Sequence, residues 1–302
     1  MRVVVLGATG TAGRGLVPLL LGAGHAVLAP VRSDAAEAVA RSVGAATARG
    51  DADDPATLAR WLRDADVAVD LRVAVPAGKR ALRPGGWRDY TDLRDRATGR
   101  LVDAAIATGT RRVVRDTITM VYADGGERLL VESAAVEAPG AMRANLDAEA
   151  HVARLTAAGG EGVALRLAPF YGPHDSASSD LLARARRGQA LVLAPAAAWT
   201  SALHTDDVGP ALAVAVMAPA VTGVWNVSDD DPLRAAELVE VLAGAVGRDG
   251  LRTPPRALLR LAPAPVRALG RSQRVTSAAF RTATGWRPGV PSRRQGWPAA
   301  AG

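Results

Sequence analysis

Residues 7–13, GATGTAG, form a glycine-rich turn that leaves this chain few choices of fold. The turn follows the apolar run of residues 3–6 and precedes leucines at helical spacing, which predicts a buried strand, a tight turn and a helix. Such a turn needs Gly7 to reverse direction, Gly10 to let a pyrophosphate approach the backbone, and Gly13 to let the helix pack closely. Because the helix N-terminus would face the phosphates, we expect a dinucleotide-binding site.

Apolar runs and amphipathic segments alternate beyond this turn. The pattern predicts strands over 2–6, 26–31, 45–48, 67–71, 112–117 and 162–167. It predicts helices over 12–22, 34–43, 55–63, 92–108 and 142–158, the third with Pro55 in its first turn and Asp53 or Asp54 as its cap. We therefore expect an α/β fold with a doubly wound parallel sheet. Later elements are expected near 178–187 (helix), 191–193 and 224–227 (strands), and 232–246 (helix).

The GxxGxxG spacing resembles that of the short-chain dehydrogenase/reductase superfamily, in its extended and atypical branches. The resemblance covers nearly the whole chain and includes Arg49-Gly50-Asp51, the strands over 67–71 and 112–114, residues 163–173, the turn 204–208, and the closing Gly285-Trp286-Arg287-Pro288. It implies a dinucleotide-binding Rossmann domain over 1–167. It also implies that 168–302 form mostly a smaller, interleaved substrate lobe, with some segments returning to the sheet.

The catalytic pair of this superfamily is missing. Its members normally use a tyrosine and, four residues on, a lysine that holds the cofactor ribose and lowers the phenol pKa, so that the phenol can donate a proton. Laid on the family pattern, the tyrosine position falls on Ala141 and the lysine position on Asn145, and the only lysine is Lys79 in a loop. The proton donor is therefore left unknown, and the weak candidates are Thr117, Thr119, Tyr171 and His174.

The end of the second expected strand bears on the choice of cofactor. An NAD enzyme normally places a carboxylate there, whereas this chain has Arg32, which can grip a 2′-phosphate. We therefore expect NADP(H), with Arg14 either adding a contact or lying in solvent. The resemblance and the turn together place the cofactor against Gly7, Thr9, Gly10, Thr11, Ala12, Gly13, Arg32, Asp51, Ala52, Leu71, Arg72, Asn145, Pro169 and Phe170.

The substrate site is expected near the loop over 73–89 and the loop after the sixth strand. Trp87 would either stack on a planar ligand or pin its loop to the core. Tyr171 and His174 would shape the reacting pocket. The turn residue His204 is expected to be a structural hydrogen-bonder.

Composition excludes several classes of function. The chain has 302 residues and no cysteine, which excludes disulfides and thiolate chemistry, and we expect no metal site. Its formal charge of +7 is scattered rather than gathered with aromatics, so we expect no nucleic-acid binding. No apolar run is long enough to cross a bilayer, and the first expected strand begins at residue 2, so we expect a cytoplasmic protein without membrane association.

These observations predict an NADPH-dependent ketoreductase that reduces a planar aromatic ketone or quinone. Without the Tyr/Lys pair, a phenol beside the carbonyl would stabilise the alkoxide, and water would complete protonation. The resemblance implies an atypical ketoreductase of aromatic polyketide tailoring for antibiotic biosynthesis, such as one acting on an angucyclinone. The alternative is an inactive regulator that senses NADP(H). A nucleotide-sugar epimerase or dehydratase is less favoured because its chemistry leans on the missing tyrosine. Oligomeric state stays open.

Overall fold

The protein is built on a parallel sheet of seven strands, seen in a computed structural model that describes residues 1–76, 78–83, 85–173, 175–254 and 264–301. From one edge to the other the strands are β11 (Gly223–Val227), β7 (Glu161–Leu167), β5 (Arg112–Ile118), β4 (Val67–Asp70), β1 (Arg2–Leu6), β2 (Ala26–Val31) and β3 (Ala46–Arg49). The order reverses between β1 and β4, as in a doubly wound sheet, so the expected fold class is confirmed.

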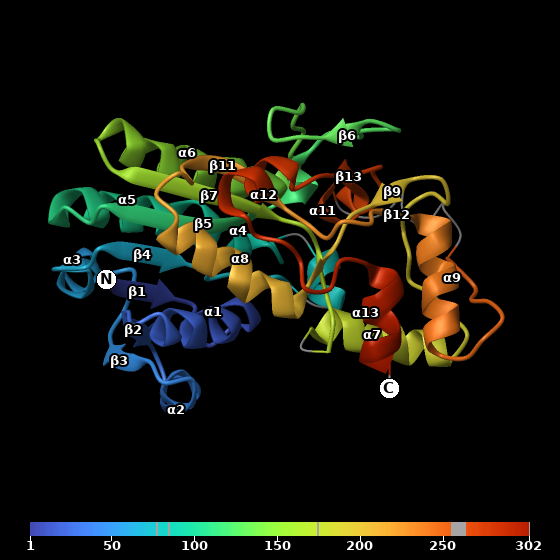
Figure 1. Cartoon of the computed structure of the whole chain (residues 1–302), viewed down its shortest axis with the longest axis horizontal. Helices are drawn as coiled ribbons and strands as arrows, with labels where there is room; N and C mark the ends of the chain where they lie inside the picture. Colours follow the sequence, from blue (N-terminus) through green and yellow to red (C-terminus); the bar gives the residue numbers. More distant parts are fainter. Residues whose placement is uncertain (77, 84, 174, 255–263, 302) are drawn as a thin grey trace.

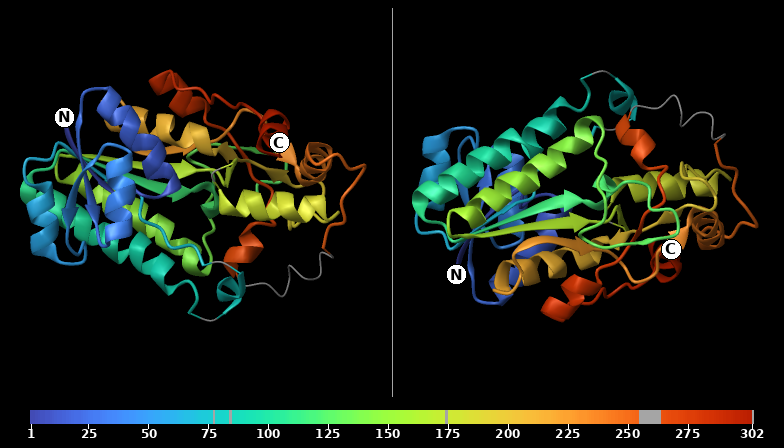
Figure 2. Two further views of the ribbon diagram at one scale, coloured as in Figure 1. Left: turned by 90° about the horizontal axis from the view of Figure 1, so that it is seen from below. Right: turned by 90° about the horizontal axis from the view of Figure 1, so that it is seen from above.

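Helices cover both faces of the sheet because successive side chains of a strand point to opposite sides (Figures 1 and 2). Val3 and Val5 face a core that includes α1 (Thr11–Gly22), α8 (Thr205–Met217) and α12 (Ala278–Thr284). Val4 and Leu6 face a second core formed with α3 (Pro55–Leu62), α5 (Arg96–Thr108) and α6 (Arg143–Ala157). The right panel of Figure 2 shows α5 and α6 on one side of the sheet and α8 and α12 on the other.

A smaller lobe lies beyond the carboxyl ends of the strands (Figure 1). Its helices are α7 (Ser176–Arg186), α9 (Ala235–Ala245), α11 (Ala264–Ala268) and α13 (Arg293–Ala301). Its short strands pair as β8 (Phe170–Tyr171) with β10 (Leu203–His204), β9 (Trp199–Thr200) with β12 (Leu233–Arg234), and β6 (Leu129–Leu130) with β13 (Arg274–Val275). The remaining helices are α2 (Asp34–Ser42), α4 (Arg88–Arg94) and the 3₁₀ turns η1 (Gly78–Leu82), η2 (Thr119–Val121) and η3 (Gly140–Met142).

Some elements that follow residue 167, namely β11, α8 and α12, belong to the layers of the sheet rather than to the lobe. Strand β11 pairs in parallel with β7, and α8 packs along α1. That packing is close: a Cβ added to Gly209 would lie 2.5 Å from the carbonyl carbon of Gly15. The predicted boundary at residue 167 therefore divides the sequence but not the sheet layers.

Most predicted elements form, two differ, and α8 is among the elements that were not predicted. Asp54 caps α3 with Pro55 in its first turn, as expected. The helix expected over 92–108 is instead α4 and α5, broken at Asp95, whose ψ of −81° departs from helical geometry. The strand expected over 191–193 does not form, and these apolar side chains line a cavity instead. The helix α8 was not predicted, since Gly209 and Pro210 interrupt its apolar pattern.

Candidate active site

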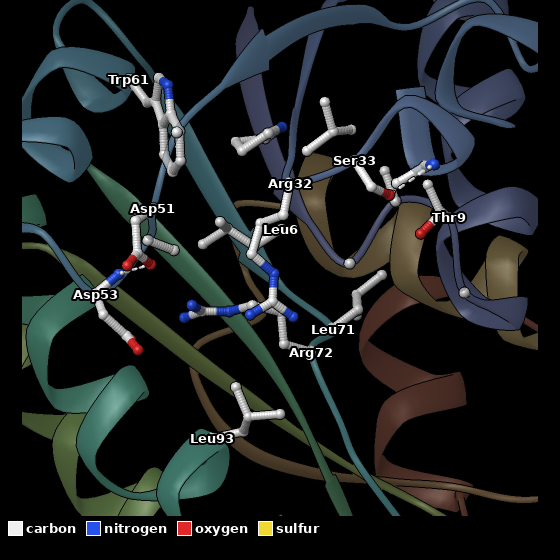
Figure 3. A pocket seen from close by; sticks show the side chains of 18 of the residues that line it. Leu6, Thr9, Arg32, Ser33, Asp51, Asp53, Trp61, Leu71, Arg72 and Leu93 are labelled. Carbon is white, nitrogen blue, oxygen red and sulfur yellow. Dashed lines mark hydrogen bonds between the residues drawn. The ribbon is translucent and has the colours of Figure 1, made fainter. Parts of the chain in front are cut away.

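A cavity of about 360 Å³ opens at the carboxyl ends of β1, β2, β3 and β4, where the sheet order reverses (Figure 3). Eight of the residues predicted to contact the cofactor line it: Gly7, Thr9, Gly10, Arg32, Asp51, Ala52, Leu71 and Arg72. The lining also includes residues that were not predicted to contact the cofactor, among them Ser33, Trp61 and Leu93. Thr11 and Ala12 lie in the first turn of α1 and Gly13 follows them, outside the lining set, so their contact with a cofactor stays a prediction.

The three glycines of the turn differ in how much space a Cβ would have at each position. Gly7 has φ of +82°, and a Cβ there would lie 2.8 Å from the carbonyl carbon of Leu71. A Cβ on Gly13 would lie 2.5 Å from the Cα of Ala8. At Gly10, by contrast, φ is −75°, and the nearest atom that an added Cβ would meet, the Gly7 oxygen, lies 3.4 Å away. The fold therefore requires glycine at two of the positions, whereas space at Gly10 is left for a ligand, as a pyrophosphate needs.

Two guanidinium groups reach into this cavity (Figure 3). Arg72 is held by Asp70 in a two-pronged ion pair, with Nε to Oδ1 at 2.8 Å and Nη2 to Oδ2 at 2.9 Å. Arg32 is exposed at the end of β2 and has no ion-pair partner in the part of the chain that the structure describes. Its cation is thus available to an anionic ligand.

A buried network of charges lies beneath Arg72. Asp70 is fully buried. Burial raises its pKa, but the guanidinium groups of Arg115 and Arg72 together have the larger, opposite effect, and the pKa falls to about 2. Arg115, also fully buried, donates to Asp116 at 3.0 Å, and Asp116 accepts in turn from Arg94 at 3.0 Å. Sequence reasoning missed this network, although charged residues inside a central strand were a signal, because both faces of a parallel sheet are normally apolar.

The positions predicted for the missing tyrosine and lysine, Ala141 and Asn145, do not line this cavity. Asn145 is fully buried in α6, where its Nδ2 donates to the Tyr90 hydroxyl at 2.8 Å and to the Met142 carbonyl at 3.0 Å. It is absent from the residues that line the cavity, so its predicted cofactor contact stays a prediction. Ala141 lies one turn earlier, in η3. Neither side chain carries an acidic proton that it could donate.

A second cavity, of about 340 Å³, lies between the carboxyl ends of β5 and β7 and the lobe. Met120, just after β5, and Pro169, just after β7, line it, so it lies on the side where the nicotinamide half of a dinucleotide is expected. Its lining is mostly apolar and aromatic and includes Phe170, Tyr171, Leu181, Val192, Trp199 and Trp297. Pro169, Phe170 and Tyr171, predicted at the site from sequence, thus line this second cavity rather than the first.

The candidate proton donors are poorly suited to acid catalysis in this arrangement. Burial, together with the nearby Asp229, raises the pKa of Tyr171, and its hydroxyl has no partner among the described residues. Thr117 donates to Glu149 and to the Leu165 carbonyl, inside the core. The hydroxyl of Thr119 is buried without a described partner. His174 lies outside the described residues.

Trp87 and His204 lie outside both cavities. Trp87 donates from Nε1 to the Ala81 carbonyl, and its ring meets Tyr90 edge-on at 5.3 Å, which is the loop-pinning arrangement. A ligand contact by Trp87 stays a prediction. The His204 ring accepts from the Asp206 amide and caps α8, the structural role expected for it. Across the described residues no helix is long and apolar enough to cross a bilayer, and no group of three His, Cys, Asp or Glu could hold a metal ion.

A family model corresponds to this geometry. The model of the NAD dependent epimerase/dehydratase family matches residues 3–228. The chain belongs to this family. A curated relative, the 3-diazoavenalumate denitrifying reductase of a Streptomyces species, is 36% identical over 315 residues, spanning 98% of this chain and 99% of the relative. Together the family and this relative identify the chain as an NAD(P)-dependent oxidoreductase, as predicted.

Solved structures of the family have the same fold. MoeE5 in complex with UDP-glucose and NAD has a TM-score of 0.80 at 22% identity, covering 100% of this chain and 97% of that chain. The human epimerase family protein SDR39U1 with NADPH has a TM-score of 0.79 at 22% identity, covering 100% of this chain and 99% of that chain. At these identities the likeness concerns the fold, and the neighbours carry a nicotinamide cofactor.

Proposed function

We propose that this chain is an NADPH-dependent reductase that delivers hydride to a planar aromatic substrate without a proton donor from the protein. The observation that carries the proposal is the fate of the catalytic pair. Ala141 stands at the predicted tyrosine position. Asn145, at the predicted lysine position, is buried, and its side-chain amide donates hydrogen bonds to Tyr90 and Met142. The substrate must therefore be one whose reduction does not depend on an acidic side chain there.

Loss of the acid need not abolish hydride transfer. General acid catalysis contributes ~10²- to 10⁴-fold, whereas holding two reactants in a reactive geometry reaches effective molarities of ~10⁵ M or more. Bound NADPH would supply the hydride. The residues of this chain would supply position: the turn and Arg32 for the cofactor, and the second cavity, beside its nicotinamide half, for the substrate.

The preference for NADPH rests on the end of β2. Arg32 and Ser33 occupy the place where an NAD enzyme normally has a carboxylate, and both line the first cavity. A guanidinium there pairs with a 2′-phosphate in two parallel hydrogen bonds. A solved family neighbour, SDR39U1, is bound to NADPH, whereas others are bound to NAD.

An aryl diazonium group is the electrophile that best fits a site without an acid. Hydride attacks the ring carbon that bears the nitrogen, a C–H bond forms, and the C–N bond breaks with its electron pair leaving in N₂. No proton enters the balance: aryl diazonium and NADPH give arene, N₂ and NADP⁺. The relative that matches 98% of this chain is named for a diazo compound and for denitrifying reduction.

The aromatic ketone predicted from sequence is the second candidate. Its reduction leaves an alkoxide, which needs a proton from a neighbouring phenol and then from water. The mostly apolar cavity of about 340 Å³ suits either planar substrate. The two candidates differ in which carbon receives the hydride, and this difference can be measured.

The test is reduction under anaerobic conditions with NADPH deuterated at the transferring carbon. We expect 4-diazoniobenzoate to yield benzoate with deuterium at the carbon that had carried nitrogen, together with N₂. Gly10→Val, which we expect to lack the cofactor, measures the background reaction. Turnover of a phenol-flanked aryl ketone alone, with deuterium on the carbinol carbon, would favour the second candidate. NADPH binding without turnover of either class would contradict the proposal and favour the sensing regulator.

A further inference from the structure

We propose that the second cavity recognises an aromatic acid, and that Arg293 pairs with its carboxylate. This inference rests on the proposed function and names the substrate class for it. Arg293 is 3% exposed, at the start of α13, yet it lines the cavity. Its Nη2 donates to the Thr200 carbonyl, and its Nε has no partner among the described residues.

No carboxylate lies within ion-pair distance of Arg293 in the described part of the chain. Arg271, the other cation of the cavity wall, is different: it pairs with Glu137 and donates to the carbonyls of Tyr122 and Glu137. A buried charge without a counterion is costly, so buried cations normally have an anionic partner. The cavity wall has no Asp or Glu among its described lining residues. The missing partner is therefore supplied by the ligand.

Asp229, the acidic group with the largest electrostatic effect on Arg293, does not neutralise it at neutral pH. Asp229 is 3% exposed, and both of its carboxyl oxygens lack a described partner. Burial raises its pKa to about 8, although Arg293 acts in the opposite direction, so the carboxyl is mostly protonated at pH 7. Tyr171, the other acidic group that faces Arg293 beside the aspartates, is a phenol whose pKa is raised, so it carries no charge either.

The other charged groups around this pair are engaged elsewhere. Asp231 accepts from Ser292 at 2.6 Å and pairs with Arg294. Asp230 pairs with Arg281. Arg294 itself also pairs with Glu237 and adds positive charge near Arg293. At neutral pH the polar end of the cavity is thus cationic.

Aromatic side chains surround the rest of the space. The rings of Tyr171 and Trp297 lie 5.5 Å apart, and Phe170 and Trp199 also line the wall. A flat apolar body with one anionic end is the ligand that satisfies both features. Aromatic monocarboxylates have that shape and charge.

The test measures binding without turnover, using 4-hydroxycinnamate and its neutral amide as probes in titration calorimetry. Wild type should bind the acid about tenfold or more tightly than the amide, as a charge-assisted contact provides. Arg293→Met, of similar length and without charge, should remove this preference and leave amide binding nearly unchanged. Arg294→Met, on the next residue and outside the cavity, is the matched control and should keep it.

Asp229 provides an independent readout in case Arg293→Met does not fold. As pH rises from 7 to 9 the carboxyl ionises and competes for Arg293, so the acid preference of wild type should fall. Asp229→Asn should keep its preference across this range. Equal binding of acid and amide by wild type would overturn the inference, as would an acid preference that neither variant alters. Because binding is measured apart from reduction, a chain that binds the acid but reduces nothing would refute only the proposed function.

Discussion

The side chains of Arg32 and Arg72 enter one cavity from the ends of β2 and β4, the two strands that flank β1 (Figure 3). Their partners differ. Arg72 is fixed by Asp70, which neutralises it, whereas Arg32 has no ion-pair partner among the described residues. Like charges that converge on one space favour an anionic ligand there. Arg72 is held in one position on the cavity wall, whereas the exposed side chain of Arg32 is free to reorient toward an added phosphate.

Arg32→Ala should lower the preference for NADPH over NADH by about tenfold or more, because a charge-assisted contact is worth ~1.5 to 3 kcal/mol. Affinities for both cofactors can be measured by nicotinamide fluorescence. Arg41→Ala, on α2 and outside the cavity, is the control. An unchanged ratio of affinities in Arg32→Ala would show that the 2′-phosphate lies elsewhere.

Gly10→Val should abolish cofactor binding and leave the fold intact. The added Cβ meets little protein, since the nearest atom, the Gly7 oxygen, is 3.4 Å away, and the side chain fills the space expected for the pyrophosphate. Calorimetry and circular dichroism test the two halves of this expectation. Gly22→Val, on the same helix with no atom within 4 Å, controls for the substitution itself. Normal binding by folded Gly10→Val would place the phosphates elsewhere.

Asn145→Ala should cost stability more than chemistry. The variant leaves the buried Tyr90 hydroxyl and the Met142 carbonyl without their partner, which should lower the free energy of unfolding by about 1–3 kcal/mol. At saturating substrates kcat should change little, with at most a modest rise in cofactor KM. Tyr90→Phe, which removes the same contact from α4, should match it. A collapse of kcat in folded Asn145→Ala would assign this residue an active role.

Asp229→Asn should change how stability depends on pH. A carboxyl whose pKa is about 8 in the folded protein and near 4 when unfolded keeps its proton longer when folded. The contribution of this proton to the free energy of unfolding is complete below the unfolded pKa. It is lost as pH rises toward and through 8, at up to ~1.4 kcal/mol per pH unit. Urea unfolding at pH 5, 6.5 and 8 should show that the free energy of unfolding of the variant rises relative to that of wild type as pH rises. Parallel curves would mean that the Asp229 carboxyl titrates normally.

The fold could be predicted closely from local pattern where each element carries its own signals. Asp54 and Pro55 mark the start of α3 by a cap and a fixed φ, and the Val-rich runs mark buried strands. The break at Asp95 could not be seen, because the helical pattern continues across it and its carboxylate accepts from His151, a residue 56 positions later. Helix α8 was hidden by Gly209, a residue needed for the close approach to Gly15.

The two halves of the candidate site differed in how far sequence could predict them. The cofactor cavity was accessible because a single turn, residues 7–13, carries most of its geometry. The second cavity draws on Tyr171, Arg271 and Arg293, which no local pattern relates to one another. Asp229 shows the same limit, because its unusual environment is made by burial, by Arg293 of α13 and by the backbone at Ala202. Burial of such residues is a property of the packed chain, and composition does not encode it.

The late position of β11 in the chain also has a consequence for how the protein is made. During synthesis β7 remains an open edge of the sheet until residues 223–227 emerge and pair with it. The surface of α1 around Gly15 is likewise uncovered until α8 arrives. Open edges and bare apolar faces are sites of intermolecular pairing. A chain that ends after β7 should thus hold the nucleotide-binding turn and still be prone to aggregate, because the residues that cover its open edge and α1 lie in 205–227.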